Sequence, residues 1–239
     1  MKVFLINLDK NTDRLAYMTS RLNELHIPFE RIPAVYGAML KKDELHKSFA
    51  AFRSFLCEGR RVTKGEIGCA LSHCEVYRRI IDENLPCALV LEDDVALGDE
   101  LPRVLHDVEQ FCKADTPQAV LLSAHGIEEP RRKQSGIERI GSGMCTDAYV
   151  ITNAGARLVL HSNFPMVAVA DRWIRWKKRF GLELYRAWPM TAWQDKTRFP
   201  DSDVSNHPQR RRGLRLFVHR IFRAVELSVD WGLFKMTGK

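Results

Sequence analysis

Short apolar runs alternate with amphipathic stretches along most of the chain. Residues 3–8 are apolar except for Asn7, as expected for a buried strand, and a polar turn follows them. After this turn, apolar side chains recur at helical spacing: Leu15, Met18, Leu22 and Leu25. The N-terminal segment is therefore predicted to fold as strand, turn and helix, the opening unit of a nucleotide-binding α/β domain.

The same alternation continues through the middle of the chain. Thr63 and Glu66 have the spacing of a capping box, which predicts the start of a long helix. Pro86 ends that helix, and the wholly apolar run 87–91 is typical of a central strand covered on both faces. Strands alternating with helices favour one α/β domain, residues 1–205, with an open, largely parallel, Rossmann-like sheet. The remaining predicted elements are strands over 29–35, 118–123, 145–152 and 183–188 and helices over 153–161 and 171–180.

The composition shifts near Asn206, where a basic C-terminal tail over 206–239 begins. The chain carries 37 Lys and Arg against 30 Asp and Glu, a net charge of +7, and the segment 210–223 holds much of the excess. An apolar stripe in the tail predicts an amphipathic helix, which either lies in an anionic membrane interface or docks on the domain with its arginines in water. No recognition motif accompanies the charge, so we expect no nucleic-acid partner.

Composition and cysteine usage narrow the class of protein further. The 239 residues are 45% hydrophobic and 28% charged, which excludes collagen-like, low-complexity and mostly disordered classes. No apolar run approaches the roughly 18–20 residues needed to cross a bilayer, and the first apolar run reaches Asp9 too soon for a secretory signal. The six cysteines include no CxxC pair. We therefore expect reduced thiols in a cytoplasmic protein, not a disulfide framework or a zinc site.

Three adjacent carboxylates, Glu92, Asp93 and Asp94, follow the central apolar run. Ligands of open α/β sheets bind at the carboxyl ends of the strands, so this position favours a binding site. Residues i and i+2 of an extended segment face the same way, which predicts that Glu92 and Asp94 converge while Asp93 points elsewhere. Their mutual repulsion favours a bound cation, and oxygen ligands suit Mg²⁺ or Mn²⁺. Such a cation can bridge the phosphates of a nucleotide-sugar. The alternative interpretation is a solvated acidic turn.

Polar residues at the first strand-to-helix turn form a second candidate site. Asn7, Asp9 and Arg14 surround a predicted helix start, whose unsatisfied N–H groups attract an anion. The alternative is a helix cap beside an exposed arginine. No glycine-rich phosphate-binding fingerprint is present, which disfavours a dinucleotide or P-loop site.

Further candidates lie along the rest of the chain. His73 shares a helical stripe with Glu66, so it is either a pocket residue that contacts nucleotide or metal or a hydrogen-bonded structural histidine. Asp147 and Asp171 are candidate general bases, although on spacing alone Asp171 is better explained as a helix N-cap. His207 follows the last predicted strand in a polar stretch that can return to the metal.

Several segments together resemble glycosyltransferase family 25, in order and spacing over roughly residues 3–175. The most specific are Gly-Glu-Ile-Gly-Cys at 65–69 and Glu-Asp-Asp at 92–94. The other matching segments are residues 4–9 with Arg14, 34–37, 70–73, 89–91 with Val95, 148–152 with Gly155 and Ala156, and Asp171.

The resemblance implies a GT-A-like fold and an inverting transfer from a nucleotide-sugar, commonly UDP-galactose. It implies a metal site at the acidic triplet, with Glu92 and above all Asp94 as ligands, and Asp171 as the preferred base ahead of Asp147. Tyr36 departs from the family pattern, which more often has an acidic residue there. The resemblance also implies a donor pocket that contains Asn7, Arg14, Glu66 and His73. We expect the neighbouring residues Asp9, Gly65 and Asp93 to belong to the same binding site.

We therefore expect a glycosyltransferase that uses a UDP-sugar and Mn²⁺ or Mg²⁺ to extend a lipooligosaccharide or lipopolysaccharide. The tail would hold it on the inner face of the cytoplasmic membrane. Two alternatives stay open. One is a metal-dependent phosphohydrolase, although Asn11 stands where an aspartyl-phosphate motif requires a second aspartate after Asp9. The other is a non-catalytic module that binds nucleotide-sugar or glycolipid.

Overall fold

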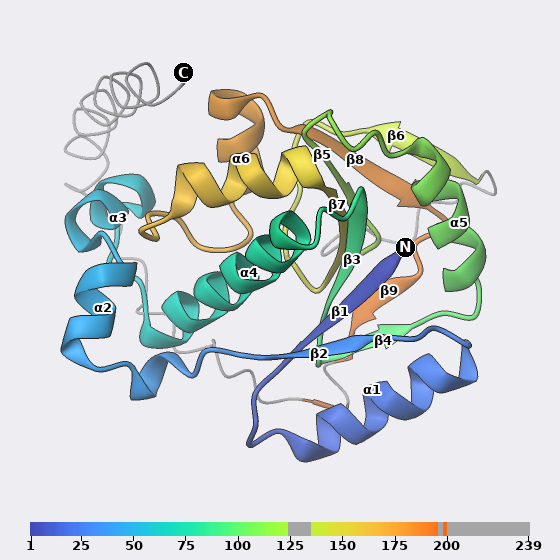
Figure 1. Ribbon diagram of the computed structural model, residues 1–239, viewed down its shortest axis with the longest axis horizontal. Helices are drawn as coiled ribbons and strands as arrows, with labels where there is room; N and C mark the ends of the chain where they lie inside the picture. The colour runs from blue at the N-terminus through green and yellow to red at the C-terminus, as the bar shows by residue number, and fades with distance from the viewer. Residues whose placement is uncertain (124–134, 196–197, 200–239) are drawn as a thin grey trace.

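A seven-stranded mixed sheet lies at the centre of the structure (Figure 1). The computed structural model describes residues 1–123, 135–195 and 198–199. The order of the strands in the sheet is β2-β1-β3-β7-β5-β8-β6. Their bounds are β1 Lys2–Asn7, β2 Glu30–Pro33, β3 Cys87–Glu92, β5 Gln118–Leu121, β6 Gly136–Arg139, β7 Ala148–Thr152 and β8 Glu183–Trp188. The short strands β4 (Val95–Leu97) and β9 (Ala192–Gln194) form a separate antiparallel pair.

The strand directions confirm a mostly parallel sheet and add an antiparallel strand to its middle. β1 pairs in parallel with β2 and β3, and β5 pairs in parallel with β8. β7 is antiparallel to both β3 and β5, and β6 is antiparallel to β8. Within the described sheet, five of the seven strands therefore share one direction, and β6 and β7 oppose them. The antiparallel placement of β7 was not predicted.

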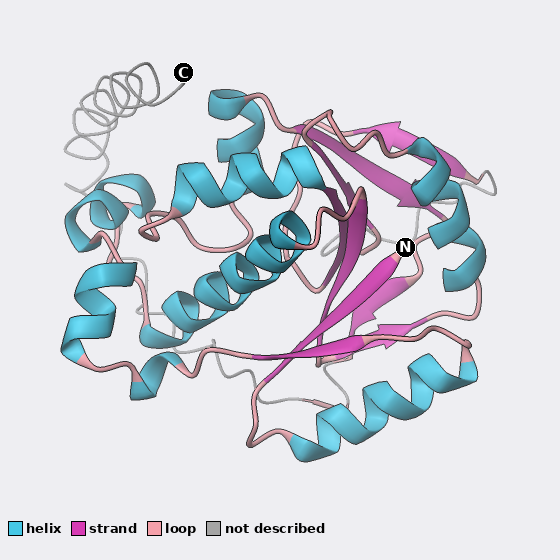
Figure 2. Ribbon diagram, in the orientation of Figure 1, coloured by secondary structure: helices cyan, strands magenta, loops and turns pink. Residues whose placement is uncertain are grey.

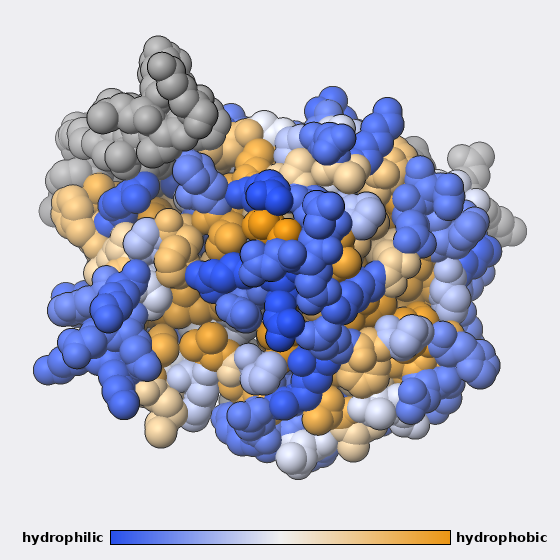
Figure 3. Space-filling model, in the orientation of Figure 1, coloured by the Kyte–Doolittle hydropathy of each residue, from blue (hydrophilic) through white to orange (hydrophobic). Residues whose placement is uncertain are grey.

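Helices cover both faces of the sheet and give the structure three layers (Figure 2). α1 (Thr12–Glu24) and α5 (Leu101–Phe111) pack on one face, and α4 (Lys64–Asp82) and α6 (Asn153–Asn163) pack on the other. On the face drawn in Figure 3, hydrophilic side chains cover much of the helical layer and hydrophobic ones show in patches between them. The sheet is thus the buried middle layer, as the apolar runs predicted.

Side-chain alternation along β1 shows how the sheet is held between two cores. Val3 and Leu5 pack into the core that contains Met18 of α1. Phe4 and Ile6 point the other way, into the core beneath α4 and α6. Because both faces of β1 and β3 are buried, the carboxyl ends of these strands are fixed against two layers at once.

The remaining helices lie in the connections around this core. Between β2 and α4 the chain forms the 3₁₀ turn η1 (Gly37–Met39) and the helices α2 (Lys42–Ser48) and α3 (Ala51–Glu58). After α6 it forms α7 (Trp173–Arg175), which continues into the π-helical turn η2 (Trp176–Phe180).

Most predicted elements are confirmed, but several have shifted ends: the strand predicted over 29–35, for example, spans only Glu30–Pro33. The predicted strand over 145–152 begins at residue 148, and the predicted helix over 171–180 begins at residue 173 and becomes π-helical at residue 176. A capping box does begin α4: the Thr63 hydroxyl accepts from the Glu66 amide at 3.1 Å, and the Glu66 carboxylate accepts from the Thr63 amide at 2.7 Å. Helices α2, α3 and α5 and strands β4, β6 and β9 were not predicted.

The C-terminal part of the chain lies outside the described residues. The predicted helical tail over 206–239 and the candidate ligand His207 both belong to it. Among the residues that the structure describes, no helix combines the length and the apolar character needed to span a membrane.

Candidate functional site

A cavity of about 520 Å³ opens at the carboxyl ends of β1 and β3. Its walls are the turn between β1 and α1, the segment around η1, the first half of α4 and the acidic triplet after β3. The loops that precede β7 and α7, together with β9, complete it. Since ligands of open α/β sheets bind at this edge, the cavity is the candidate site.

All three carboxylates of the triplet line the cavity. β3 ends at Glu92, and Asp93 and Asp94 form a turn. Strand alternation therefore stops at Glu92, and the prediction that Asp93 points elsewhere was wrong: Asp93 faces the same cavity as its two neighbours. A turn can aim successive side chains at one space, which a pleated strand cannot.

Asn7 and Arg14 hold Asp93 in place. Asn7 Nδ2 donates to one carboxylate oxygen of Asp93 over 2.7 Å, and Arg14 Nη1 donates to the other over 3.1 Å. Burial raises the pKa of Asp93, and these two donors oppose the rise. Arg14 lines the cavity, whereas the buried Asn7 supports the wall. Asp9 is exposed, pairs with Arg31 and lies outside the cavity lining.

Asp94 presents a buried oxygen to the cavity. Its Oδ2 accepts a hydrogen bond from Gln194 Nε2 at 3.1 Å, but its Oδ1 has no hydrogen-bond partner among the described residues. The side chain is buried, and this burial, followed by the charge of Glu92, raises the pKa of Asp94 to about 6. A buried carboxylate oxygen without a partner is costly. Oxygen ligands of this kind fit a hard divalent cation such as Mn²⁺ or Mg²⁺.

The beginning of α4 contributes a second charged group. Arg60 donates through both terminal guanidinium nitrogens to the carboxylate of Glu66, which also caps the helix. Arg60, Gly65 and Glu66 all line the cavity. The carboxylate of Glu66 thus serves to cap α4 and to hold Arg60 at the wall.

His73 is buried and hydrogen-bonded at both ring nitrogens. Its Nδ1 lies 2.8 Å from the Tyr149 hydroxyl and its Nε2 lies 3.1 Å from Glu92 Oε1. Thr146 donates to the same oxygen of Glu92 over 2.6 Å. His73 is thus a hydrogen-bonded structural residue that also lines the cavity, and its contact with nucleotide or metal stays a prediction.

The two candidate bases lie on different cavity loops. Asp147 is buried and accepts a hydrogen bond from the Ser123 hydroxyl over 2.5 Å. Asp171 is partly exposed, and burial raises its pKa. The helix N-cap position belongs to Arg172, so Asp171 does not cap α7. An accessible carboxyl group with a raised pKa suits proton removal better than one that already holds a hydroxyl donor.

An ion pair to the buried carboxylate of Glu58 fixes the loop that carries Asp171. Glu58, at the end of α3, accepts from Arg172 Nε over 3.0 Å and from Arg172 Nη2 over 2.5 Å. It also accepts from the amide of Val169 over 3.3 Å. Because Val169 and Arg172 flank Asp171, α3 sets the position of the candidate base.

Sequence reasoning missed several residues that line the cavity, among them Arg60, Cys69 and Gln194. Cys69 could have been found, since it stands one helical turn before His73. Gln194 could not: it lies 100 residues from Asp94 along the chain and no local pattern marks it.

Fold and site together define an α/β protein with an acidic cavity at the carboxyl edge of a Rossmann-like sheet. Residues 1–174 match the family model described as glycosyltransferase family 25 (LPS biosynthesis protein), and the chain belongs to this family.

Curated relatives carry related names. The chain is 33% identical over 173 residues to procollagen galactosyltransferase 1-B of Xenopus laevis and 30% identical over 172 residues to procollagen galactosyltransferase 1 of Danio rerio. It is also 30% identical over 174 residues to inactive glycosyltransferase 25 family member 3 of Homo sapiens. Each alignment covers 67% of this chain, but only 28%, 28% and 29% of the respective relatives. The chain thus spans less than a third of their length, and one of the three is named inactive.

Proposed function

We propose that this protein is an inverting galactosyltransferase that moves galactose from UDP-galactose to a lipooligosaccharide or lipopolysaccharide acceptor and requires Mn²⁺ or Mg²⁺. The observation that carries the proposal is Asp94 Oδ1, buried and without a partner among the described residues, in a cavity also lined by Arg14 and Arg60. The relatives' names support the sugar, and the description of the family supports the acceptor.

In this proposal, different residues of the cavity have different roles in a displacement at the anomeric carbon. Asp94, with Asp93 or Glu92 beside it, would hold the cation, which neutralises negative charge on a departing diphosphate when it is bound. Arg14 and the first amides of α1 give that end of the cavity a positive potential. On the opposite loop, Asp171 accepts the proton of the acceptor hydroxyl, and Glu58 keeps the loop in position.

Its place of action is part of the same proposal. A glycolipid acceptor is anchored in a membrane, so the enzyme would work as a peripheral protein on the inner face of the cytoplasmic membrane. The basic residues and the apolar stripe of the tail over 206–239 support this proposal, because such a segment is attracted to anionic lipid.

A transfer assay tests the function. The full chain is incubated with a panel of UDP-sugars and a truncated lipooligosaccharide, with Mn²⁺ or with EDTA, and the glycolipid product and released phosphate are both measured. We expect transfer from UDP-galactose that EDTA abolishes. Asp94→Ala should lower turnover at least ~10²-fold, because loss of the cation removes several kcal/mol of charge stabilisation. Asp107→Ala, which removes an exposed carboxylate on α5, is the matched control.

Three outcomes would contradict the proposal. Phosphate release without a glycolipid product identifies a phosphohydrolase. Donor binding without turnover across the whole panel identifies a non-catalytic module. Equal rates of transfer by the wild type and Asp94→Ala would show that Asp94 does not hold a cation that the reaction requires.

A further inference from the structure

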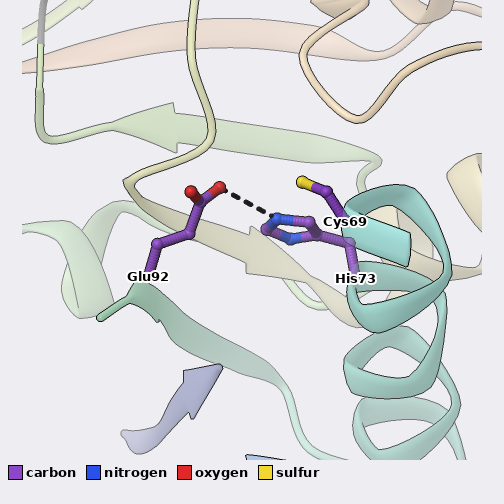
Figure 4. Close-up of side chains that lie close together, drawn as sticks. All are labelled: Cys69, His73 and Glu92. Atoms are coloured by element: carbon purple, nitrogen blue, oxygen red, sulfur yellow. Dashed lines mark hydrogen bonds and ion pairs between the residues drawn. The ribbon is translucent and has the colours of Figure 1, made fainter. Parts of the chain in front are cut away.

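A second set of ligand atoms adjoins the acidic corner, shares Glu92 with it and differs from it in chemistry. Cys69, His73 and Glu92 each offer one ligand atom, and these three atoms all lie within 4.8 Å of one another. Cys69 and His73 are one turn apart on α4, and Glu92 ends β3 (Figure 4). In Figure 4 the thiol of Cys69 and the carboxylate of Glu92 point toward each other, and a dashed line joins the carboxylate to the His73 ring.

We propose that Cys69, His73 and Glu92 form a binding site for a soft divalent cation, Zn²⁺ in the first place, which adjoins the hard-cation corner at Asp94 and shares Glu92 alone with it. One thiolate, one imidazole and one carboxylate are ligand types that Zn²⁺ takes together, and a site with three protein ligands leaves the fourth position open. All three residues line the cavity, so that open position faces solvent or a bound molecule.

The surroundings of His73 match those of a metal-binding histidine. For Nε2 to bind a cation, the ring proton must sit on Nδ1, where the Tyr149 hydroxyl lies 2.8 Å away as acceptor. Tyr149 in turn lies 2.9 Å from the hydroxyl of Tyr77, so it has a group to receive its own proton. Thr146 orients Glu92 from the other side. Such outer hydrogen bonds fix the orientation of metal ligands.

Charge balance favours a divalent ion at this position. Burial and nearby carboxylates raise the pKa of Cys69 well above its ordinary value, so the thiol is neutral without a metal. On binding, the S–H bond breaks, the metal–sulfur bond forms and the proton leaves to solvent. One thiolate and one carboxylate then cancel the two positive charges of the ion, which limits the cost of burying it.

Ligand softness separates the two cation positions of the cavity. Thiolate and imidazole prefer Zn²⁺ or Co²⁺, whereas Mg²⁺ and Mn²⁺ prefer oxygen ligands. The soft site does not depend on the proposed transferase activity. One consequence of the soft site does depend on that activity. Since Glu92 and His73 face the proposed donor pocket, Zn²⁺ bound there should inhibit sugar transfer.

Cobalt titration of the metal-free full chain tests the site. Co²⁺ bound through a thiolate gives a near-ultraviolet charge-transfer band, and we expect this band to saturate at one Co²⁺ per chain. Zn²⁺ should displace the Co²⁺ and abolish the band, while Mg²⁺ in excess should leave it unchanged. The wild-type titration needs no variant, so it tests the site even where a substitution prevents folding. A titration without a thiolate band overturns the proposal.

Variants assign the band to this thiol. Cys69→Ala should lose it, while Cys74→Ala, which removes the buried second thiol of α4, should keep it. Tyr149→Phe retains every ligand and should weaken Zn²⁺ binding by about 10–100-fold through loss of the outer hydrogen bond. A band that persists in Cys69→Ala, or unchanged Zn²⁺ affinity in Tyr149→Phe, contradicts the assignment. Cobalt binding without any sugar transfer would refute the proposed function and leave the soft site standing.

Discussion

The fold places the carboxyl group of Asp94 in a buried position that disfavours its charged form. Its side chain is buried, one of its oxygens has no partner among the described residues, and its pKa is raised from 3.8 to about 6. In the unfolded chain, the carboxyl group of Asp94 would ionise near its ordinary pKa. Folding is therefore opposed by Asp94 at neutral pH, and the opposition is absent below about pH 4.

We predict that Asp94→Asn stabilises the metal-free protein. The pKa of Asp94 is higher in the folded protein than in the unfolded chain. The stability of the wild type should therefore fall as the pH rises from about 4 to about 6, and this pH dependence should be absent from the variant. At pH 7 the free energy of unfolding should increase by roughly 1–3 kcal/mol. Thermal or urea unfolding in EDTA at several pH values measures it. A variant less stable than the wild type at pH 7 would show that Asp94 contributes to folding.

Single residues divide into those that the sequence reveals and those that only the fold brings together. Glu92 and Asp94 were identified because charges directly after an apolar run stand out. The partners that decide their chemistry, Gln194 and Thr146, lie far along the chain, in or before strands whose placement is set by tertiary contacts. The direction of Asp93 was predicted wrongly, because the strand ends at Glu92, two residues before the Asp94 position to which the alternation was extended.

At the scale of elements, close packing between η1 and α4 shapes one cavity wall. A side chain on Gly68 would place its Cβ 2.4 Å from the Val35 carbonyl oxygen and 2.7 Å from the Gly37 amide nitrogen. Both neighbours are backbone atoms, which cannot rotate away. Glycine at position 68 therefore lets the segment around η1 lie directly on α4, beside the cavity.

We predict that Gly68→Ala destabilises the protein although alanine favours helix. The gain in helix propensity is about 1 kcal/mol, but the overpacking forces backbone atoms apart. A net loss of roughly 1–3 kcal/mol in the free energy of unfolding is expected, together with weaker UDP binding as the wall moves. Gly141→Ala is the control, since its Cβ would meet nothing within 4 Å. Equal unfolding midpoints for both variants would show that the segment around η1 can shift and make room for the added methyl group at little cost in free energy.

Elements with a strong local pattern were predictable and those held by tertiary contacts were not. β1, α4 and β8 follow from apolar runs and a capping box that act within the segment itself. β4 and β9 are three residues long and depend on pairing with each other. The antiparallel direction of β7 escaped prediction because an apolar run shows burial, not direction.

At the scale of the molecule, a three-layer α/β fold brings sites from across the chain to one sheet edge. The sequence motifs sufficed to predict the family, which the match over residues 1–174 shows. Family membership alone does not decide activity, since relatives of this chain include proteins named inactive. The ligands of the cavity must therefore be measured directly.

Calorimetric titration of UDP into the full chain tests the central claim most directly. With Mn²⁺ present, we predict one UDP bound per chain, at least ~10-fold weaker binding in EDTA, and loss of this metal dependence in Asp94→Asn, because the cation would link Asp94 to the diphosphate. UDP binding that is equally strong with Mn²⁺, with EDTA and in Asp94→Asn would contradict the account, and so would a complete failure of UDP to bind.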